Sequence, residues 1–125
     1  MITKDLELKV IDLGYAKNLS GRAGTGFMKT QLGTPMYMAP EIEEGKYYNG
    51  ADADVFAFGT MLFVAKAFAY PWERASSRDD GYSAISGDKI SNENFWKKYR
   101  RNVTSEEFKD LVNSTVQKDL KARAH

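Results

Sequence analysis

Asp12 is the first side chain in the sequence whose type and setting could support chemistry. It follows an apolar segment and stands two residues before Gly14. A carboxylate at the end of a strand, freed by a glycine two residues on, can reach a Mg²⁺ ion that bridges phosphate oxygens. Asp-Leu-Gly alone is also a common turn, so this spacing indicates a metal site only if other motifs agree with it.

A second unusual stretch, GTPMYMAPE at residues 33–41, surrounds one hydroxyl side chain, Thr34, with two prolines and two methionines. Pro35 and Pro40 each restrict a backbone angle and remove an amide donor, so neither a regular strand nor a helix interior can run through the stretch. The pattern predicts a shaped loop. Residues 39–42 can then open a short helix, because proline is tolerated in a first helical turn.

The elements that position these stretches are predicted from periodicity. Residues 6–11 alternate and then become fully apolar, which predicts a strand, and residues 15–18 can form a second strand that pairs with it. Residues 20–34 contain four glycines among polar side chains, so they predict a mobile loop.

The remainder of the chain predicts helices. Asp52-Ala53-Asp54 introduces an almost wholly apolar stretch, which predicts a central helix over residues 53–68 that is buried on every side. A short helix is predicted at 82–86, and an irregular segment is expected around Phe95-Trp96. A capping signal at residues 104–107 predicts another helix. The predicted fold class is mainly α with a short β pair at the N-terminus.

Composition excludes several classes of protein. The 125 residues contain 18 Lys and Arg, 17 Asp and Glu, and no cysteine. A net charge of +1 gives no large field that would attract nucleic acid or an acidic membrane, so we expect neither as a partner. Disulfides and thiolate metal sites are excluded. Together with the absence of a signal-peptide pattern, this composition predicts a cytoplasmic protein, with the nucleus as an alternative location.

Four motifs, in the same order and spacing, resemble the large lobe of a eukaryotic serine/threonine protein kinase. KVIDLGYAK resembles the strand, metal-binding turn and following strand of that family, with Asp-Leu-Gly in place of Asp-Phe-Gly. GTPMYMAPE resembles the loop that receives the substrate and the Ala-Pro-Glu that closes the activation segment. YNGADADVFAFG resembles the start of the central helix, and DLKAR resembles the Asp-x-x-x-Arg before the last helix.

This resemblance covers residues 8–123 and implies a partial kinase lobe that uses ATP and Mg²⁺ and acts on protein substrates. It divides the chain into a strand pair with the metal-binding turn at 1–18, an activation segment at 19–41, a central helix at 53–68 and a helical C-terminal part at 82–125.

The resemblance also assigns roles at the nucleotide and the substrate. Asp12 is the implied metal ligand, and the implied nucleotide-binding residues are Ile11, Asp12 and Gly14. Thr34 is expected to bond to the catalytic machinery, while Pro35 and Met38 line an apolar pocket for the residue that follows the phosphoacceptor. A threonine at this place in the motif implies serine or threonine substrates.

The same resemblance also implies a regulatory phosphosite and the residues that stabilise the lobe. Thr30 resembles the activating phosphosite, Lys17 is placed to pair with its phosphate, and Thr25 and Ser20 are alternative sites. An upstream activating kinase is the implied partner. The implied structural residues are the buried ion pair of Glu41 with Arg123, and Asp54, which in the family grips the catalytic loop but serves equally well as a helix N-terminal carboxylate.

Nothing in the sequence resembles the small lobe or the His-Arg-Asp catalytic loop of the family, so no catalytic base is expected among these residues. The isolated chain is expected to be inactive, and it could self-associate through its apolar helix. A pseudokinase or scaffold lobe that only binds protein partners is the alternative function.

Overall fold

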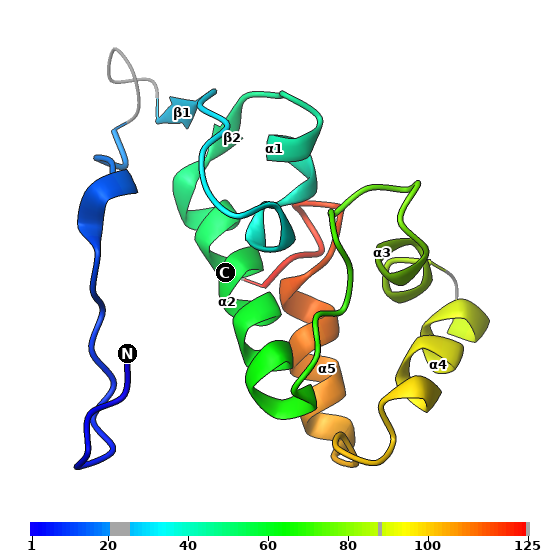
Figure 1. The fold of residues 1–125 in the computed structure, drawn as a ribbon. Coiled ribbons are helices and arrows are strands. Elements are labelled where there is room, and N and C mark those ends of the chain that lie inside the picture. The colour runs from blue at the N-terminus through cyan, green and yellow to red at the C-terminus, as the bar shows by residue number, and fades with distance from the viewer. Residues whose placement is uncertain (21–25, 88, 125) are drawn as a thin grey trace.

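The computed structural model describes residues 1–20, 26–87 and 89–124, and helices predominate among them. A two-stranded antiparallel sheet accompanies the helices, which confirms the predicted fold class. Figure 1 shows the arrangement of the elements. In chain order they are the 3-10 helix η1 (Leu13–Tyr15), β1 (Phe27–Met28), the 3-10 helix η3 (Pro35–Tyr37), α1 (Pro40–Glu43), β2 (Tyr48–Asn49), α2 (Gly50–Ala67), α3 (Asp80–Ile85), α4 (Lys89–Lys98) and α5 (Glu106–Thr115).

The sheet is formed by different residues from those predicted. β1 pairs with β2, with Phe27 opposite Asn49 and Met28 opposite Tyr48. The predicted pairing of residues 6–11 with 15–18 was wrong, because residues 13–15 form η1 instead of a strand. The short sheet therefore joins the segment before η3 to the start of α2.

Residues 1–20 form an extended arm, which Figure 1 shows apart from the helical body in blue. Its first nine residues fold back on themselves: the amide of Thr3 donates to the Glu7 carbonyl at 2.9 Å, and that of Lys9 to the Met1 carbonyl at 2.8 Å. Leu8 and Val10 are exposed. The alternation of residues 6–11 therefore meets no core surface in this structure, and burial of one face is what normally stabilises a strand of this pattern.

Helix α2 begins three residues earlier than predicted. The side chain of Asn49 is the N-cap and accepts the amide of Ala51 at 2.8 Å, and the helix ends where Phe68 adopts a left-handed conformation. Although α2 is 18 residues long, no helix in the described part of the chain is long and apolar enough to cross a membrane.

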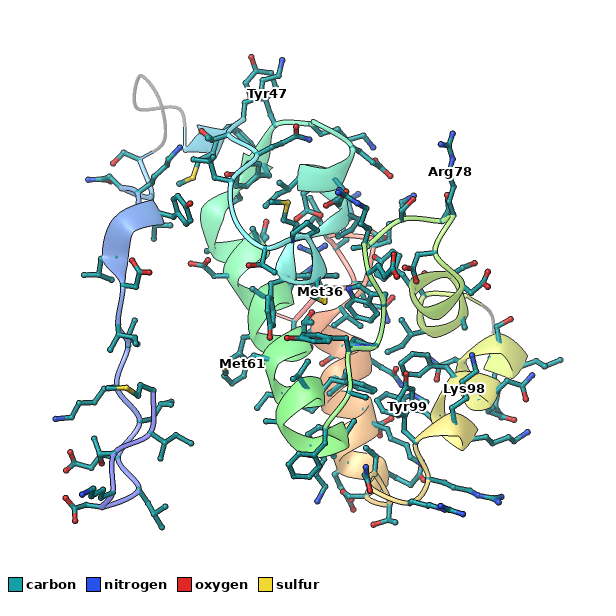
Figure 2. All side chains as sticks on the ribbon, in the orientation of Figure 1. Met36, Tyr47, Met61, Arg78, Lys98 and Tyr99 are labelled. Carbon is teal, nitrogen blue, oxygen red and sulfur yellow. The ribbon has the colours of Figure 1, made fainter. Side chains whose placement is uncertain are left out.

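Only one face of α2 is buried, so the prediction of burial on every side was wrong. Phe56, Thr60 and Phe63 lie in the core, whereas Phe58 and Met61 on another face are exposed. Figure 2 shows the Met61 side chain pointing away from α5. The buried face packs against α5. The apolar composition on all sides concealed this difference, because only the positions of neighbouring elements decide which face is covered.

Two aromatic groups fill the core on the buried side of α2. Trp72 and Tyr82 pack against Phe56 near the middle of the helix. Phe63 contacts the rings of three residues on or next to α4, with centroid separations from 4.8 to 5.7 Å. These three are Phe95, Trp96 and Tyr99.

Helix α4 corrects the expectation of an irregular segment around Phe95-Trp96. In its ten residues only Phe95 and Trp96 are buried, and its other described side chains are mostly polar. A helix with so little apolar sequence gives a weak periodic signal, and its stability comes from packing of those two rings against Phe63. Helix α5, in contrast, begins as predicted, with the Ser105 hydroxyl accepting the amide of Phe108 at 3.2 Å.

A buried ion pair joins α1 to the end of the chain. The guanidinium of Arg123 donates to both carboxylate oxygens of Glu41, at 2.7 and 3.0 Å. It also donates to the carbonyls of Gln117 and Asp52 and lies over the ring of Phe56. The structure thus brings together the two side chains that the kinase resemblance had paired.

The loop before α3 depends on Asp79, and this gives a prediction. Its carboxylate accepts the amide of Tyr82 at 3.0 Å, that of Glu73 at 2.9 Å and that of Arg74 at 3.3 Å. We expect Asp79→Ala to lower the free energy of unfolding by about 2 kcal/mol, because a helix cap and two loop amides lose their acceptor. Urea denaturation measures the change.

The matched control is the adjacent Asp80→Ala. Asp80 lies in the first turn of α3 and makes no side-chain hydrogen bond among the described residues. Its loss should cost no more than about 1 kcal/mol, through the helix dipole alone. Equal destabilisation by the two substitutions would show that the three hydrogen bonds of Asp79 contribute nothing beyond its charge.

Candidate functional site

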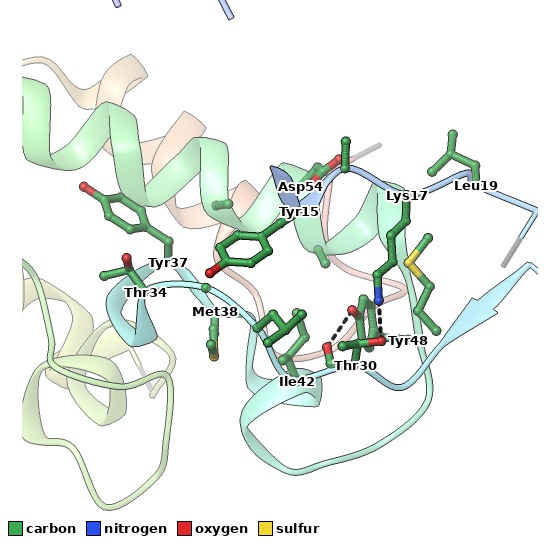
Figure 3. A pocket seen from close by; sticks show the side chains of 17 residues that line it. Tyr15, Lys17, Leu19, Thr30, Thr34, Tyr37, Met38, Ile42, Tyr48 and Asp54 are labelled. Carbon is green, nitrogen blue, oxygen red and sulfur yellow. Dashed lines mark hydrogen bonds between the residues drawn. The ribbon is translucent and has the colours of Figure 1, made fainter. Parts of the chain in front are cut away.

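A cavity of about 340 Å³ lies between the arm, the loop before α1 and the first turns of α2. Figure 3 shows this cavity and the side chains around it. It collects five of the residues that the kinase resemblance singled out, although they are spread over 38 positions of the sequence. These are Lys17, Thr30, Thr34, Met38 and Asp54.

Thr30 is held at the cavity from two sides. The Lys17 ammonium donates to the Thr30 hydroxyl, and the Tyr48 hydroxyl donates to the Thr30 carbonyl at 2.9 Å (Figure 3). Burial, with a smaller contribution from the carboxylate of Asp54, raises the pKa of the Tyr48 hydroxyl, which is the donor in this bond. The predicted phosphosite and its predicted cation are therefore already in contact.

The alternative phosphosites lie elsewhere. Ser20 is exposed on the arm, where its hydroxyl donates to the Asn18 side chain at 2.7 Å. Thr25 lies outside the described residues.

Thr34 lies at the start of η3, with an extended backbone and an exposed side chain that makes no capping hydrogen bond to the helix. Its hydroxyl is therefore available to another group at the cavity. Met38 lines the same cavity, but Pro35 lines a second hollow together with Met36. The two residues expected to share one apolar pocket thus face different spaces, because the chain turns through η3 between them.

Asp54 lies in α2 with an exposed side chain at the cavity. Capping of α2 is supplied by Asn49 instead, so local helix capping does not account for the position of Asp54. The carboxylate adds a negative group to a space that also holds the Lys17 ammonium among hydroxyl and apolar side chains.

Asp12 lies outside this cavity. It has a left-handed backbone, with φ of 59°, and one carboxylate oxygen accepts the amide of Gly14 at 3.2 Å. Ile11 and Gly14 are also exposed on the arm. Within the described residues, no group of three or more acidic or histidine side chains is gathered to hold a metal ion.

Sequence reasoning missed three aromatic residues around the loop of residues 34–38. Tyr15 and Tyr48 line the cavity. Trp72 donates its indole N–H to the carbonyl of Met36 at 3.0 Å. Tyr48, two residues before α2, was an available signal, since an aromatic side chain with a polar tip is buried best where that tip finds a partner.

The sequence is similar to those of known protein kinases. The sequence model described as the protein kinase domain matches residues 1–125. The protein kinase domain-containing protein ppk9 of Schizosaccharomyces pombe is 36% identical over 73 residues, which are 58% of this chain and 13% of that protein.

Two plant proteins give similar matches. The CBL-interacting protein kinase 30 of Oryza sativa subsp. japonica is 39% identical over 70 residues, or 56% of this chain and 15% of that protein. The serine/threonine-protein kinase SRK2F of Arabidopsis thaliana is 42% identical over 66 residues, or 53% and 18%. The chain thus spans a small part of each relative. With the family model matching along its whole length, the chain belongs to the protein kinase domain family.

Proposed function

We propose that this chain takes part in the ATP-dependent phosphorylation of serine and threonine hydroxyls in protein substrates. The observation that carries the proposal is the cavity, which collects Thr30, Thr34 and Asp54 at the first turns of α2. The printed names of relatives such as SRK2F, a serine/threonine-protein kinase, support the substrate class. In this proposal the chain supplies a metal ligand, an activation loop and a platform for the substrate.

Asp12 suits the role of a Mg²⁺ ligand. Its side chain is exposed, one oxygen is held by the Gly14 amide, and the second accepts no hydrogen bond among the described residues. One carboxylate is enough, because Mg²⁺ with a nucleotide keeps several waters and takes other ligands from phosphate oxygens. A Mg²⁺ ion held by Asp12 would supply positive charge to the phosphate oxygens. Ile11 and Gly14 lie on the same exposed stretch and form the adjoining edge of the nucleotide site.

The loop of residues 34–38 holds the substrate. Kinases gain most of their rate from positioning, so the acceptor hydroxyl must be held close to the transferred phosphate. The Thr34 hydroxyl, which has no capping bond in η3, anchors this loop to the group that accepts the hydroxyl proton. Asp54 fixes the backbone of the segment that carries this group.

Thr30 is the site at which an upstream kinase acts. A phosphate there would add a charge of roughly −1.5 to −2 and three acceptor oxygens. Lys17 already contacts the Thr30 hydroxyl and would pair with the phosphate. The added ion pair joins the arm to the loop and orders both around the cavity.

A chimera tests this function, with residues 1–123 replacing the corresponding region of the Arabidopsis kinase SRK2F. We expect it to transfer phosphate from ATP to serine and threonine peptides. Asp12→Asn should lower kcat at least about a hundredfold, because the metal loses its carboxylate ligand. Thr34→Ala should lower kcat about tenfold through poorer positioning. Radiolabelled phosphate incorporation measures both.

Asp5→Asn, on the same exposed arm, and Thr104→Ala, in an exposed loop, are the matched controls and should leave the rate unchanged. The isolated 125-residue chain, assayed in parallel, should transfer no phosphate. If the chimera unfolds as cooperatively as SRK2F yet is inactive, the proposed enzyme role fails and the scaffold alternative is favoured. Equal activity of Asp12→Asn and Asp5→Asn would exclude Asp12 as the metal ligand.

A further inference from the structure

Trp72 connects the core to the substrate loop. Its side chain is only 4% exposed. The ring packs against Phe56 and Tyr82, with centroid separations of 5.8 and 5.2 Å. From this fixed position the indole N–H donates to the carbonyl of Met36 at 3.0 Å, across 36 residues of sequence. The orientation of the indole is therefore set by the core, and the indole in turn sets the position of Met36.

A second contact joins the same two segments. The rings of Tyr37 and Tyr70 meet edge to face, with centroids 6.4 Å apart. Burial, assisted by Tyr70, raises the pKa of Tyr37. Two consecutive loop residues, Met36 and Tyr37, are thus tied to two residues that follow α2.

The backbone hydrogen bonds within η3 act only inside the loop. The amide of Tyr37 donates to the Thr34 carbonyl at 3.0 Å, and that of Met38 to the Pro35 carbonyl at 3.1 Å. These bonds fix the shape of the turn but leave its distance from the helices open. Only contacts that leave the loop, such as that of Trp72 with Met36, can set that distance.

We propose that Trp72 is a positioning residue for the substrate loop, holding residues 34–38 against the core so that the loop favours one class of residue after the phosphoacceptor. This inference rests on the proposed kinase function. Pro35, Met36, Tyr70 and Trp72 line one hollow beside the loop, so displacement of Met36 changes the apolar wall that a substrate side chain meets. The side of the hollow that these four residues form is mainly apolar, whereas its other side is lined by Glu73, Arg74, Arg78, Asp79 and Asp80. The class selected at the loop side is therefore a hydrophobic residue.

Trp72→Phe is the informative substitution, because it removes the N–H donor and keeps an aromatic ring in the core. The smaller phenyl ring also leaves unfilled volume, so the control must lose the same atoms. The matched control is Trp96→Phe. Trp96 is also buried, at 5% exposure, and packs among aromatic rings. Its N–H donates to the side chain of Asn113 in α5 at 3.2 Å, not to the substrate loop. Comparing the two variants distinguishes the effect of losing any indole hydrogen bond from the effect of losing the bond to the substrate loop.

In the SRK2F chimera we expect Trp72→Phe to raise KM about threefold to tenfold for peptides with a hydrophobic residue after the acceptor, the factor that corresponds to one net hydrogen bond. KM for ATP should stay unchanged. The preference for a hydrophobic over a charged residue at that position should fall by a similar factor. Trp96→Phe should change neither quantity. Amide exchange in the 125-residue chain should accelerate at residues 36–38 in Trp72→Phe only.

The proposed kinase function and the positioning role of Trp72 would be contradicted by different results. An inactive chimera overturns the proposed function, while the exchange measurement still tests the contact between Trp72 and the loop. If the chimera is active and Trp72→Phe matches Trp96→Phe in peptide KM, peptide preference and exchange at residues 36–38, Trp72 is a core residue and the inference is wrong.

Discussion

Replacing Arg123 by methionine should lower the free energy of unfolding by about 3–5 kcal/mol, the cost of leaving one partner of a buried ion pair alone. Both side chains of the pair are almost fully buried, and Arg123 makes two bonds to Glu41. Its loss also removes donors from the carbonyls of Gln117 and Asp52. Urea denaturation, with comparison of the midpoint and the slope, measures the change.

Two further variants test the cause. The pair of Arg74 with Glu43 has an exposed cation, so Arg74→Met should cost no more than about 1 kcal/mol. The double variant Glu41→Leu with Arg123→Met removes both buried charges and should be more stable than Arg123→Met alone. A double variant that is less stable than the single one would show that lost packing, not an unpaired carboxylate, dominates the effect.

Gly59→Ala should destabilise the fold by at least about 2 kcal/mol, although alanine favours a helix over glycine by roughly 1 kcal/mol. Gly59 lies where α2 meets α5. A Cβ added there would stand 2.0 Å from the Thr115 hydroxyl oxygen and 2.7 Å from the Thr115 Cβ. Both distances are too short for the helices to keep their separation. Thermal and urea unfolding measure the loss.

The sign of this effect is itself informative. If the helices were free to separate, Gly59→Ala would be neutral or stabilising. Thr115→Gly removes both clashing atoms, so adding Gly59→Ala to that variant should cost much less than adding it to the original chain. Equal costs in the two backgrounds would mean that the clash with Thr115 is not the cause.

Local signals in the sequence determined several parts of this protein. Pro35 and Pro40 restrict the backbone wherever they stand, so the loop of residues 33–41 and the short helix α1 follow from local geometry. The cap of α5 at Ser105 is also local, since its acceptor and donor are three residues apart. The pairing of Glu41 with Arg123 could not be predicted from any local pattern. It was predicted from the kinase resemblance.

Other parts depended on the tertiary structure. The polar sequence of α4 forms a helix because Phe63 offers an aromatic surface to Phe95 and Trp96. Residues 6–11 alternate like a strand but lie exposed, since no described element covers their apolar side. In both cases local periodicity was outweighed by the presence or absence of a packing partner.

The candidate site also depends partly on local sequence and partly on tertiary structure. The motifs identified Thr30, Thr34 and Asp54, but their meeting in one cavity depends on how the loop docks on α2. The contact of Trp72 with Met36 joins residues 36 positions apart, and no local pattern encodes such a bond. Local sequence restricts each segment's backbone, whereas burial of Phe56, Trp72 and Tyr82 against one another decides which distant segments meet.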